Sequence, residues 1–204
     1  WAARWQLQRT DSGVGDWLLA VLLAAVLGAG GGFIAGFDRR RLYVPAALAA
    51  WVLPPLFLVP RIGAWWGLDG LIALLVLSKI GDIAGYFTGN AIGKTHPFPS
   101  ISPGKTTAGC VGSLVAGTIA GGICVAIGLL PDARLGLLGG LLAGAALNIA
   151  AQAGDLAESW VKRRAEAKDS ATWFGPAGGV LDLVDSLLFS VPAALLVWPI
   201  VFAS

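Results

Sequence analysis

Long runs of apolar residues constrain this sequence more than any other feature. The segment from Trp17 to Phe37, WLLAVLLAAVLGAGGGFIAGF, contains no charged side chain, and similar runs recur up to the C-terminus. About 20 apolar residues suffice to cross the hydrocarbon core of a bilayer. Hydrophobic residues make up 56% of the chain and its mean hydropathy is +0.76, more than the core of a water-soluble domain requires. Because lipid offers no partners for open backbone groups, the sequence predicts an all-α integral membrane protein.

The runs predict a polytopic bundle of about six transmembrane helices, in a single domain over residues 1–204. We expect the helices at 17–37, 42–59, 68–89, 110–130, 135–160 and 183–203. Pro54-Pro55 is expected to kink or end the second of them. Glycine and alanine are abundant within the runs, which favours close helix packing and would also allow a homodimer. The chain contains no Met, so we expect that an N-terminal part of the protein is missing.

Lys and Arg are distributed unevenly over the two sides that six helices would define. One side has nine: Arg39, Arg40, Arg41, Lys94, Lys105, Lys162, Arg163, Arg164 and Lys168. The other side has four: Arg4, Arg9, Arg61 and Arg134. The positive-inside rule places the nine-residue side in the cytoplasm, which we expect to be bacterial. The net charge of +2 is too small to indicate nucleic-acid binding.

Ionisable residues lie within the apolar runs or at their ends. Lys79 and Asp82 are three residues apart in the third run, and acidic residues recur at 155, 158, 182 and 185. A charge at membrane depth costs at least about 2.5 kcal/mol, so these side chains should face one another or a polar cavity. They could be ion pairs that hold helices together, with Lys79 and Asp82 as the best example. However, carboxylates outnumber cations, and such a surplus of oxygen ligands suits Mg²⁺.

Two segments resemble the conserved blocks of a known family. The first is residues 82–112, DIAGYFTGNAIGKTHPFPSISPGKTTAGCVG, and the second is residues 155–186, DLAESWVKRRAEAKDSATWFGPAGGVLDLVDS. Both are similar to blocks of the CDP-diglyceride synthetases, also called phosphatidate cytidylyltransferases. The resemblance implies a membrane enzyme that joins CTP to phosphatidic acid in the bilayer, giving CDP-diacylglycerol and pyrophosphate with Mg²⁺, with room for a second cation.

The resemblance also implies roles for individual residues. The expected metal ligands are Asp82, Asp155, Asp169, Asp182 and Asp185, of which the last three also count as catalytic together with Lys162 and Lys168. The expected substrate-binding residues are Ser102, Lys105, Thr106, Arg163, Gly178 and Gly179. The lysines and the arginine would hold phosphate groups, and the glycine turns would bring backbone N–H groups close to them.

The sequence departs from the family pattern at several positions. Ala108 replaces an acidic or amide residue, Gly175-Pro176 inverts Pro-Gly, Ala177 replaces His and Leu183 replaces Arg. We expect the loss of the His and the Arg to alter nucleotide contacts or the exact choice of substrate. Because the acidic residues and the Lys-Arg and Lys-Asp pairs are intact, we favour a divergent active enzyme.

Three other functions stay open from the residues alone. A CTP-dependent kinase of a polyprenol or similar lipid alcohol would use the same groups but release CDP. An ion-coupled transporter would use the intramembrane acids, although no repeat between the halves supports it. A family member that acts only as a structural subunit is the third. With one His, His96, and no reactive Cys context, a zinc site and a Ser-His triad are set aside.

Overall fold

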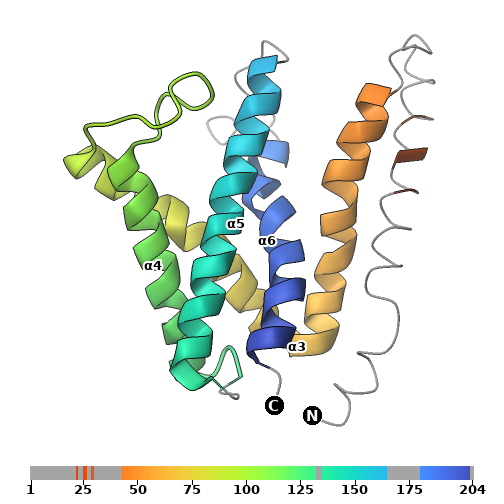
Figure 1. Cartoon of the computed structure of the whole chain (residues 1–204). Helices are drawn as coiled ribbons and strands as arrows, with labels where there is room; N and C mark the ends of the chain where they lie inside the picture. The colour runs from red at the N-terminus through yellow and green to blue at the C-terminus, as the bar shows by residue number, and fades with distance from the viewer. Residues whose placement is uncertain are drawn as a thin grey trace. The chain divides into compact units, whose positions relative to one another are not determined.

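A computed structural model describes residues 43–131, 135–164 and 180–202, with the isolated positions 22, 25, 26 and 29. In these ranges the chain is helical, without strands, and forms four helices (Figure 1). They are α3 (Tyr43–Ile92), α4 (Thr107–Ala126), α5 (Gly136–Arg164) and α6 (Val180–Val201). The all-helical prediction is therefore confirmed for the described part of the chain. The first expected helix, 17–37, lies almost wholly outside it.

Three helices contain stretches long and apolar enough to cross a membrane. These stretches are Ala49–Ile92, Thr107–Ala126 and Gly136–Arg163, and α6 contributes a shorter apolar helix over Asp185–Val201. They correspond to five of the expected runs, since two of those runs fall within α3. The membrane class predicted from the sequence is supported by these helices, and the count of six stays a prediction.

Helix α3 is interrupted at Gly67, not at the prolines. Gly67 has φ 69° and ψ −162°, while Pro54 and Pro55 both lie inside the helix. A positive φ disfavours any residue with a Cβ, so Gly67 is the position where the backbone can break at least cost. Of the two alternatives predicted for Pro54-Pro55, a kink or an end, the end was wrong, because the helix continues through both prolines. The break falls between the two runs expected at 42–59 and 68–89.

The chain divides into two compact units, Trp1–Arg61 and Ile62–Ser204. In the second unit α5 packs against both α4 and α6, and Figure 1 shows it running between them. The core residues here are mostly small or aliphatic, such as Leu77, Leu147 and Val191. All features of the candidate site described below belong to this second unit.

Helix α4 has two faces of opposite character. Its exposed face has Val111, Val115, Ile119 and Ile123, each more than half exposed, whereas its buried face includes Gly109, Ser113, Gly117 and Gly121. The large apolar side chains thus point outward, which is the arrangement expected for a helix in lipid. The glycines allow close contact with α5, because a Cβ on Gly121 would lie 2.1 Å from the carbonyl oxygen of Gly140. Close packing through small residues is typical of membrane helices.

Helix α6 contributes an aromatic contact to the core of the second unit. Trp198 is fully buried and packs edge-to-face on Trp66, with ring centroids 5.2 Å apart and an interplanar angle of 81°. Such edge-to-face geometry is favoured by the quadrupoles of the rings. These two tryptophans therefore lie inside the protein.

Candidate active site

A cavity of about 390 Å³ opens among the helices of the second unit. Its volume lies within the range of roughly 300–1,000 Å³ that is usual for small-molecule sites. The charged and polar residues on its wall include Lys79, Asp82, Lys105, Gln152, Asp155 and Asp185. They come from α3, from the loop before α4, and from α5 and α6, so the cavity joins residues far apart in the sequence.

Glycines on α3 form one wall of the cavity. Gly81, Gly85 and Gly89 are four residues apart and all contribute to the wall. A Cβ on Gly85 would lie 3.1 Å from the carbonyl oxygen of Gly109, and one on Gly89 would lie 2.9 Å from Oγ1 of Thr106. The four-residue spacing puts these glycines on one face of the helix, and their lack of side chains lets α3 approach the start of α4.

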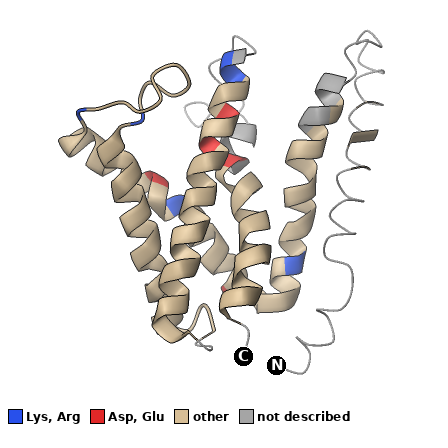
Figure 2. Cartoon of the chain, in the orientation of Figure 1, with Lys and Arg blue, Asp and Glu red and all other residues tan. Residues whose placement is uncertain are grey.

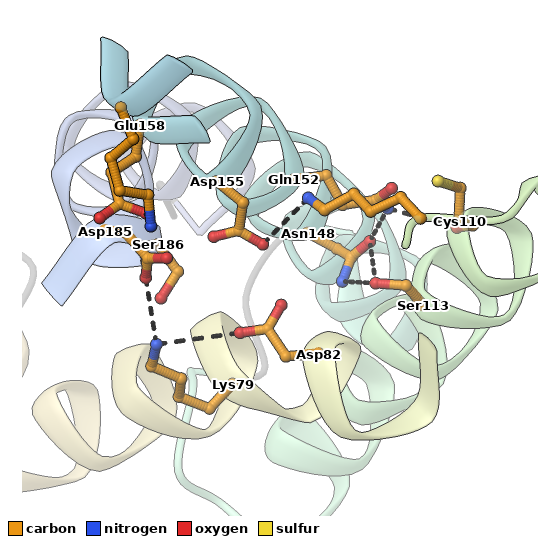
Figure 3. A network of polar contacts seen from close by, with 12 residues as sticks. Lys79, Asp82, Cys110, Ser113, Asn148, Gln152, Asp155, Glu158, Asp185 and Ser186 are labelled. Carbon is orange, nitrogen blue, oxygen red and sulfur yellow. Dashed lines mark hydrogen bonds and ion pairs between the residues drawn. The ribbon is translucent and has the colours of Figure 1, made fainter. Parts of the chain in front are cut away.

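The ammonium group of Lys79 lies between two carboxylates. Its Nζ is 3.4 Å from Oδ1 of Asp185 and 3.8 Å from Oδ2 of Asp82 (Figure 3). The contact with Asp82 agrees with the ion pair that the sequence offered as an alternative to a metal site. The contact with Asp185 connects α3 to α6.

A second ion pair joins the two sequence blocks. Nζ of Lys105, in the loop before α4, lies 3.2 Å from Oδ2 of Asp155 on α5. The other oxygen of Asp155, Oδ1, is buried and accepts no hydrogen bond within the described part of the chain. Asp155 also lies near enough to Asp82 and Asp185 to feel their charges. A buried carboxylate oxygen without a donor is costly, which makes Asp155 a position where a ligand cation or donor would be stabilising.

The basic end of α5 reaches the loop of the first block. Nε of Arg163 donates to the carbonyl oxygen of Ile101 at 3.3 Å, next to Ser102. Lys162 pairs instead with Glu158, its Nζ lying 3.1 Å from Oε2. Figure 2 shows that the acidic residues of α5 and α6 lie toward the same end of the bundle as this basic turn. Acidic and basic side chains of α5 and α6 are thus grouped at one end of these helices.

Thr106 lines the cavity and also begins α4. It is the N-cap residue, and its Oγ1 accepts a hydrogen bond from the backbone N–H of Gly109 at 3.1 Å. Ser102 lies one turn earlier, where its carbonyl oxygen accepts from the backbone N–H of Lys105 at 3.1 Å. This turn directs Lys105 to the cavity. A helix N-terminus also presents partial positive charge, which favours nearby phosphate groups.

Several predicted site residues lie outside the described part of the chain. They are Lys168, Asp169, Gly178 and Gly179, and the side chain of Asp182 is also outside it, although its backbone belongs to α6. Within the described ranges, no three acidic, His or Cys side chains lie close enough together to hold a metal ion. The cavity wall nonetheless has three carboxylates, and one of them has an oxygen without a hydrogen-bond partner among the described residues. Carboxylate oxygens are the ligands that Mg²⁺ prefers.

Sequence reasoning did not identify two polar residues of α5 at or beside the cavity wall. Asn148 and Gln152 on α5 form hydrogen bonds with each other and with α4. The signal was their spacing, because Asn148, Gln152 and Asp155 are separated by four and three residues on an otherwise apolar helix. That spacing places all three on one face. Lys79 was interpreted as the partner of Asp82, and its contact with Asp185 was not foreseen.

Comparisons of the sequence with known proteins identify the family. A sequence model of the cytidylyltransferase family matches residues 18–201. The phosphatidate cytidylyltransferase of Brucella suis is 40% identical over 138 residues, which is 68% of this chain and 49% of that protein. The enzyme of the same name from Chlamydia trachomatis is 38% identical over 141 residues, covering 65% of this chain and 43% of that protein.

A third relative is the phosphatidate cytidylyltransferase of Bacillus subtilis. It is 35% identical over 127 residues, covering 62% of this chain and 46% of that protein. The chain thus spans about half the length of the curated relatives it matches. Because the family match extends over nearly all of the chain, the chain belongs to the cytidylyltransferase family.

Proposed function

We propose that this protein is a phosphatidate cytidylyltransferase, which transfers CMP from CTP to phosphatidic acid in phospholipid biosynthesis. The observation that carries the proposal is the meeting of the two sequence blocks around one cavity. Lys105 from the first block pairs with Asp155 from the second, 50 residues apart in the chain. The names of the relatives from Brucella, Chlamydia and Bacillus point to the same reaction.

In the proposed reaction, an oxygen of the phosphate monoester of phosphatidic acid attacks the α-phosphorus of CTP. A new P–O bond forms there, the bond between the α-phosphorus and the oxygen that bridges to the β-phosphorus breaks, and pyrophosphate leaves with that oxygen. The attacking oxygen is already largely ionised near neutral pH. The main task of the protein is therefore to hold two anions together and to stabilise the added charge, since no strong base is required.

The cations around the cavity suit this task. Lys79 and Lys105 are neutralised by carboxylates in the absence of substrate, so arriving phosphate oxygens would compete for them. We propose that Lys105 with Ser102 and Thr106 binds one phosphate group, and that Arg163, Lys162 and Lys168 bind the other. Gly178 and Gly179 would contribute backbone N–H groups. Arg is suited to bidentate phosphate contact and Lys acts as a point charge.

We include Mg²⁺ in the proposal, and a second cation is compatible with it. Asp82, Asp155 and Asp185 would be its ligands together with Asp169 and Asp182, and because the three described carboxylates do not lie close enough to hold one ion as placed, binding would draw them together. The buried, unpartnered oxygen of Asp155 supports this choice. When bound, the ion would share the negative charge of phosphate oxygens. Removal of divalent ions by a chelator should then abolish turnover, and added Mg²⁺ should restore it.

We also propose the membrane arrangement expected from the sequence: six helices, with the cavity open to the cytoplasmic side. The uneven distribution of Lys and Arg supports the orientation, and the three long apolar helices support the membrane setting. Association into a homodimer through small-residue helix faces is part of the same proposal. Mass measurement of the protein in detergent would test it.

The reaction has a direct test. Purified full-length protein in micelles with CTP, phosphatidic acid and Mg²⁺ should release one pyrophosphate for each CDP-diacylglycerol formed. Asp185→Asn should abolish turnover, whereas Asp69→Asn, an exposed position away from the cavity, should leave it unchanged. Release of CDP with a lipid alcohol would instead indicate a kinase. A folded protein that forms neither product would contradict the proposal.

A further inference from the structure

A buried network of three polar side chains adjoins the cavity, and two of them, Ser113 and Gln152, lie on its wall. Nδ2 of Asn148 donates to Oγ of Ser113 at 3.1 Å, and Oγ of Ser113 lies 3.3 Å from Oδ1 of Asn148. Nε2 of Gln152 donates to Oδ1 of Asn148 at 2.7 Å and to the carbonyl oxygen of Cys110 at 3.3 Å. Asn148 is 1% exposed and Ser113 is 5% exposed. Figure 3 shows the network beside Asp155.

Glycines on two helices enclose the amide group of Asn148. A Cβ on Gly81 of α3 would lie 1.9 Å from Nδ2 of Asn148, and one on Gly117 of α4 would lie 2.6 Å from its Cβ. No side chain fits at either position while Asn148 stays in place. The amide is therefore held by packing as well as by hydrogen bonds, and it provides a rigid support for Gln152.

The contact with Cys110 fixes the direction of the hydrogen bonds. Asn and Gln amides have a donor and an acceptor end that are similar in shape. A backbone carbonyl can only accept, so the end of Gln152 that contacts Cys110 is its NH₂ group. The same NH₂ group then requires Asn148 to present its oxygen. Both N–H bonds of Gln152 are thus used within the network.

The remaining polar atom of Gln152 is Oε1, which can only accept. No donor to this oxygen occurs among the described residues, and Gln152 lines the cavity. Gln152 lies three residues before Asp155, about 4.5 Å along the helix axis. The cavity wall therefore includes, besides its charged side chains, a neutral acceptor one turn before Asp155 on α5.

We propose that Gln152 determines nucleotide specificity by accepting a hydrogen bond from the exocyclic amine of the cytosine base. This inference rests on the proposed function. A triphosphate held at Lys105 would leave the base of the same molecule to occupy the rest of the cavity, on whose wall Gln152 lies. The network serves this role because it prevents Gln152 from turning its NH₂ group toward the ligand.

The fixed polarity explains how CTP would be chosen over UTP. The amine of cytosine is a donor, whereas the corresponding group of uracil is a carbonyl that accepts. With UTP, two acceptor oxygens would face each other and neither would have a donor. Sites that use buried hydrogen-bonding groups reject such analogues strongly, because groups left unpaired lose their solvation without compensation.

The test is a double comparison of two proteins and two nucleotides. The nucleotides are CTP and the 2-pyrimidinone ribonucleoside triphosphate, which lacks only the exocyclic amine. The proteins are the full-length wild type and Gln152→Met, which keeps the length of the side chain and removes its oxygen. Binding is measured by displacement of labelled CTP, and kcat/KM is measured alongside. In the wild type, loss of the amine should weaken binding about 10- to 100-fold, and in Gln152→Met it should change binding less than about twofold.

The control variant and the possible results distinguish failure of the inference from failure of the proposed function. Thr118→Val is a control on α4, since the Thr118 hydroxyl bonds to its own helix and lies outside the cavity wall, and it should keep the wild-type ratio. If loss of the amine weakens binding equally in the wild type and in Gln152→Met, the inference is overturned while the proposed function stands. If the folded wild type binds no nucleotide, both are overturned. The comparison of the two nucleotides in the wild type needs no variant. Equal binding of CTP and the analogue to the wild type would therefore also contradict the inference.

Discussion

Lys79 shows how a single side chain can connect distant parts of this molecule. It lies on the same helix as Asp82 and contacts Asp185, 106 residues further along the chain. Its partners differ in exposure, since the side chain of Asp185 is 15% exposed and that of Asp82 is 36% exposed. The less exposed contact is screened less by solvent, so we expect it to contribute more to the attachment of α3 to α6.

Replacement of this lysine should destabilise the protein and increase its response to divalent ions. In Lys79→Gln, Asp82 and Asp185 lose a shared cation, which should lower stability by about 1 kcal/mol, or about 2 to 4 °C in melting temperature. Mg²⁺ should restore part of the loss because it can replace the missing charge. Melting in detergent with and without Mg²⁺ measures both effects. Lys94→Gln, an exposed loop position, serves as the charge-matched control.

A second residue prediction concerns Asp155. Asp155→Asn keeps the shape of the side chain but removes the negative charge opposite Lys105, as well as a proposed metal ligand. We expect kcat to fall by about 100-fold or more, as is usual when ligands or their close partners are lost. Pyrophosphate release with saturating substrates provides the measurement. A rate near that of the wild type in this variant would remove Asp155 from the site.

Five residues that the sequence suggested for the site, Asp82, Lys105, Thr106, Asp155 and Asp185, lie on the wall of one cavity, but their partners could not be predicted and their roles stay predictions. The resemblance to the family implied functional roles for Lys105, Asp155 and Asp185. The contact of Lys79 with Asp185 depends on how α3 packs on α6, and the hydrogen bonds that hold Gln152 depend on how α4 packs on α5. Such contacts between distant residues follow from tertiary structure, and helical periodicity alone gives only the face on which a residue lies.

At the level of elements, α4 illustrates how packing is inverted in a membrane helix. Its large side chains are exposed and its small ones are buried. Gly121 lies against Gly140 and Gly144 of α5, with a prospective Cβ only 2.1 Å from a backbone oxygen. Backbone atoms cannot move aside as a flexible side chain would, so this contact should tolerate substitution poorly.

Gly121→Leu should therefore separate α4 from α5. Overpacking of a close contact typically costs about 1–3 kcal/mol, and a backbone clash belongs at the upper end of that range. We expect a melting temperature lower by about 5 °C or more in detergent. Ala126→Leu puts the same side chain at an exposed position of the same helix and should leave the melting temperature unchanged. Equal effects of the two substitutions would argue against the close contact.

The helices themselves were largely predictable, and their interruptions were not. Runs of apolar residues located α4, α5 and α6 to within a few residues of the observed bounds. The prolines at 54 and 55 are strong breakers in water, yet within an apolar helix neighbouring groups can compensate for the lost hydrogen bond. The break occurs instead at Gly67, one of 29 glycines in the sequence, and its positive φ has no distinct sequence signal.

For the whole molecule, the main expectation is its orientation in the membrane. The loop before α4 should lie in the cytoplasm and the loop after α4 on the opposite side, because α4 is long enough for one crossing. Single cysteines at Lys94 and Pro131, in a chain with Cys110 and Cys124 replaced by Ala, allow a test. An impermeant thiol reagent added to intact cells should label Pro131→Cys, and should label Lys94→Cys only after the membrane is opened. The reverse labelling pattern would show that the protein has the opposite orientation in the membrane.

The position of Lys79 on the same helix as Asp82 has a consequence for biosynthesis. The ribosome makes α3 long before α6, so Asp82 enters the bilayer at a time when Asp185 does not yet exist. With Lys79 one turn away, the nascent helix carries its own counterion and can be inserted with less penalty than a lone carboxylate would impose. When α6 follows, the lysine becomes the point to which the late helix attaches, so one residue would assist first insertion and then assembly.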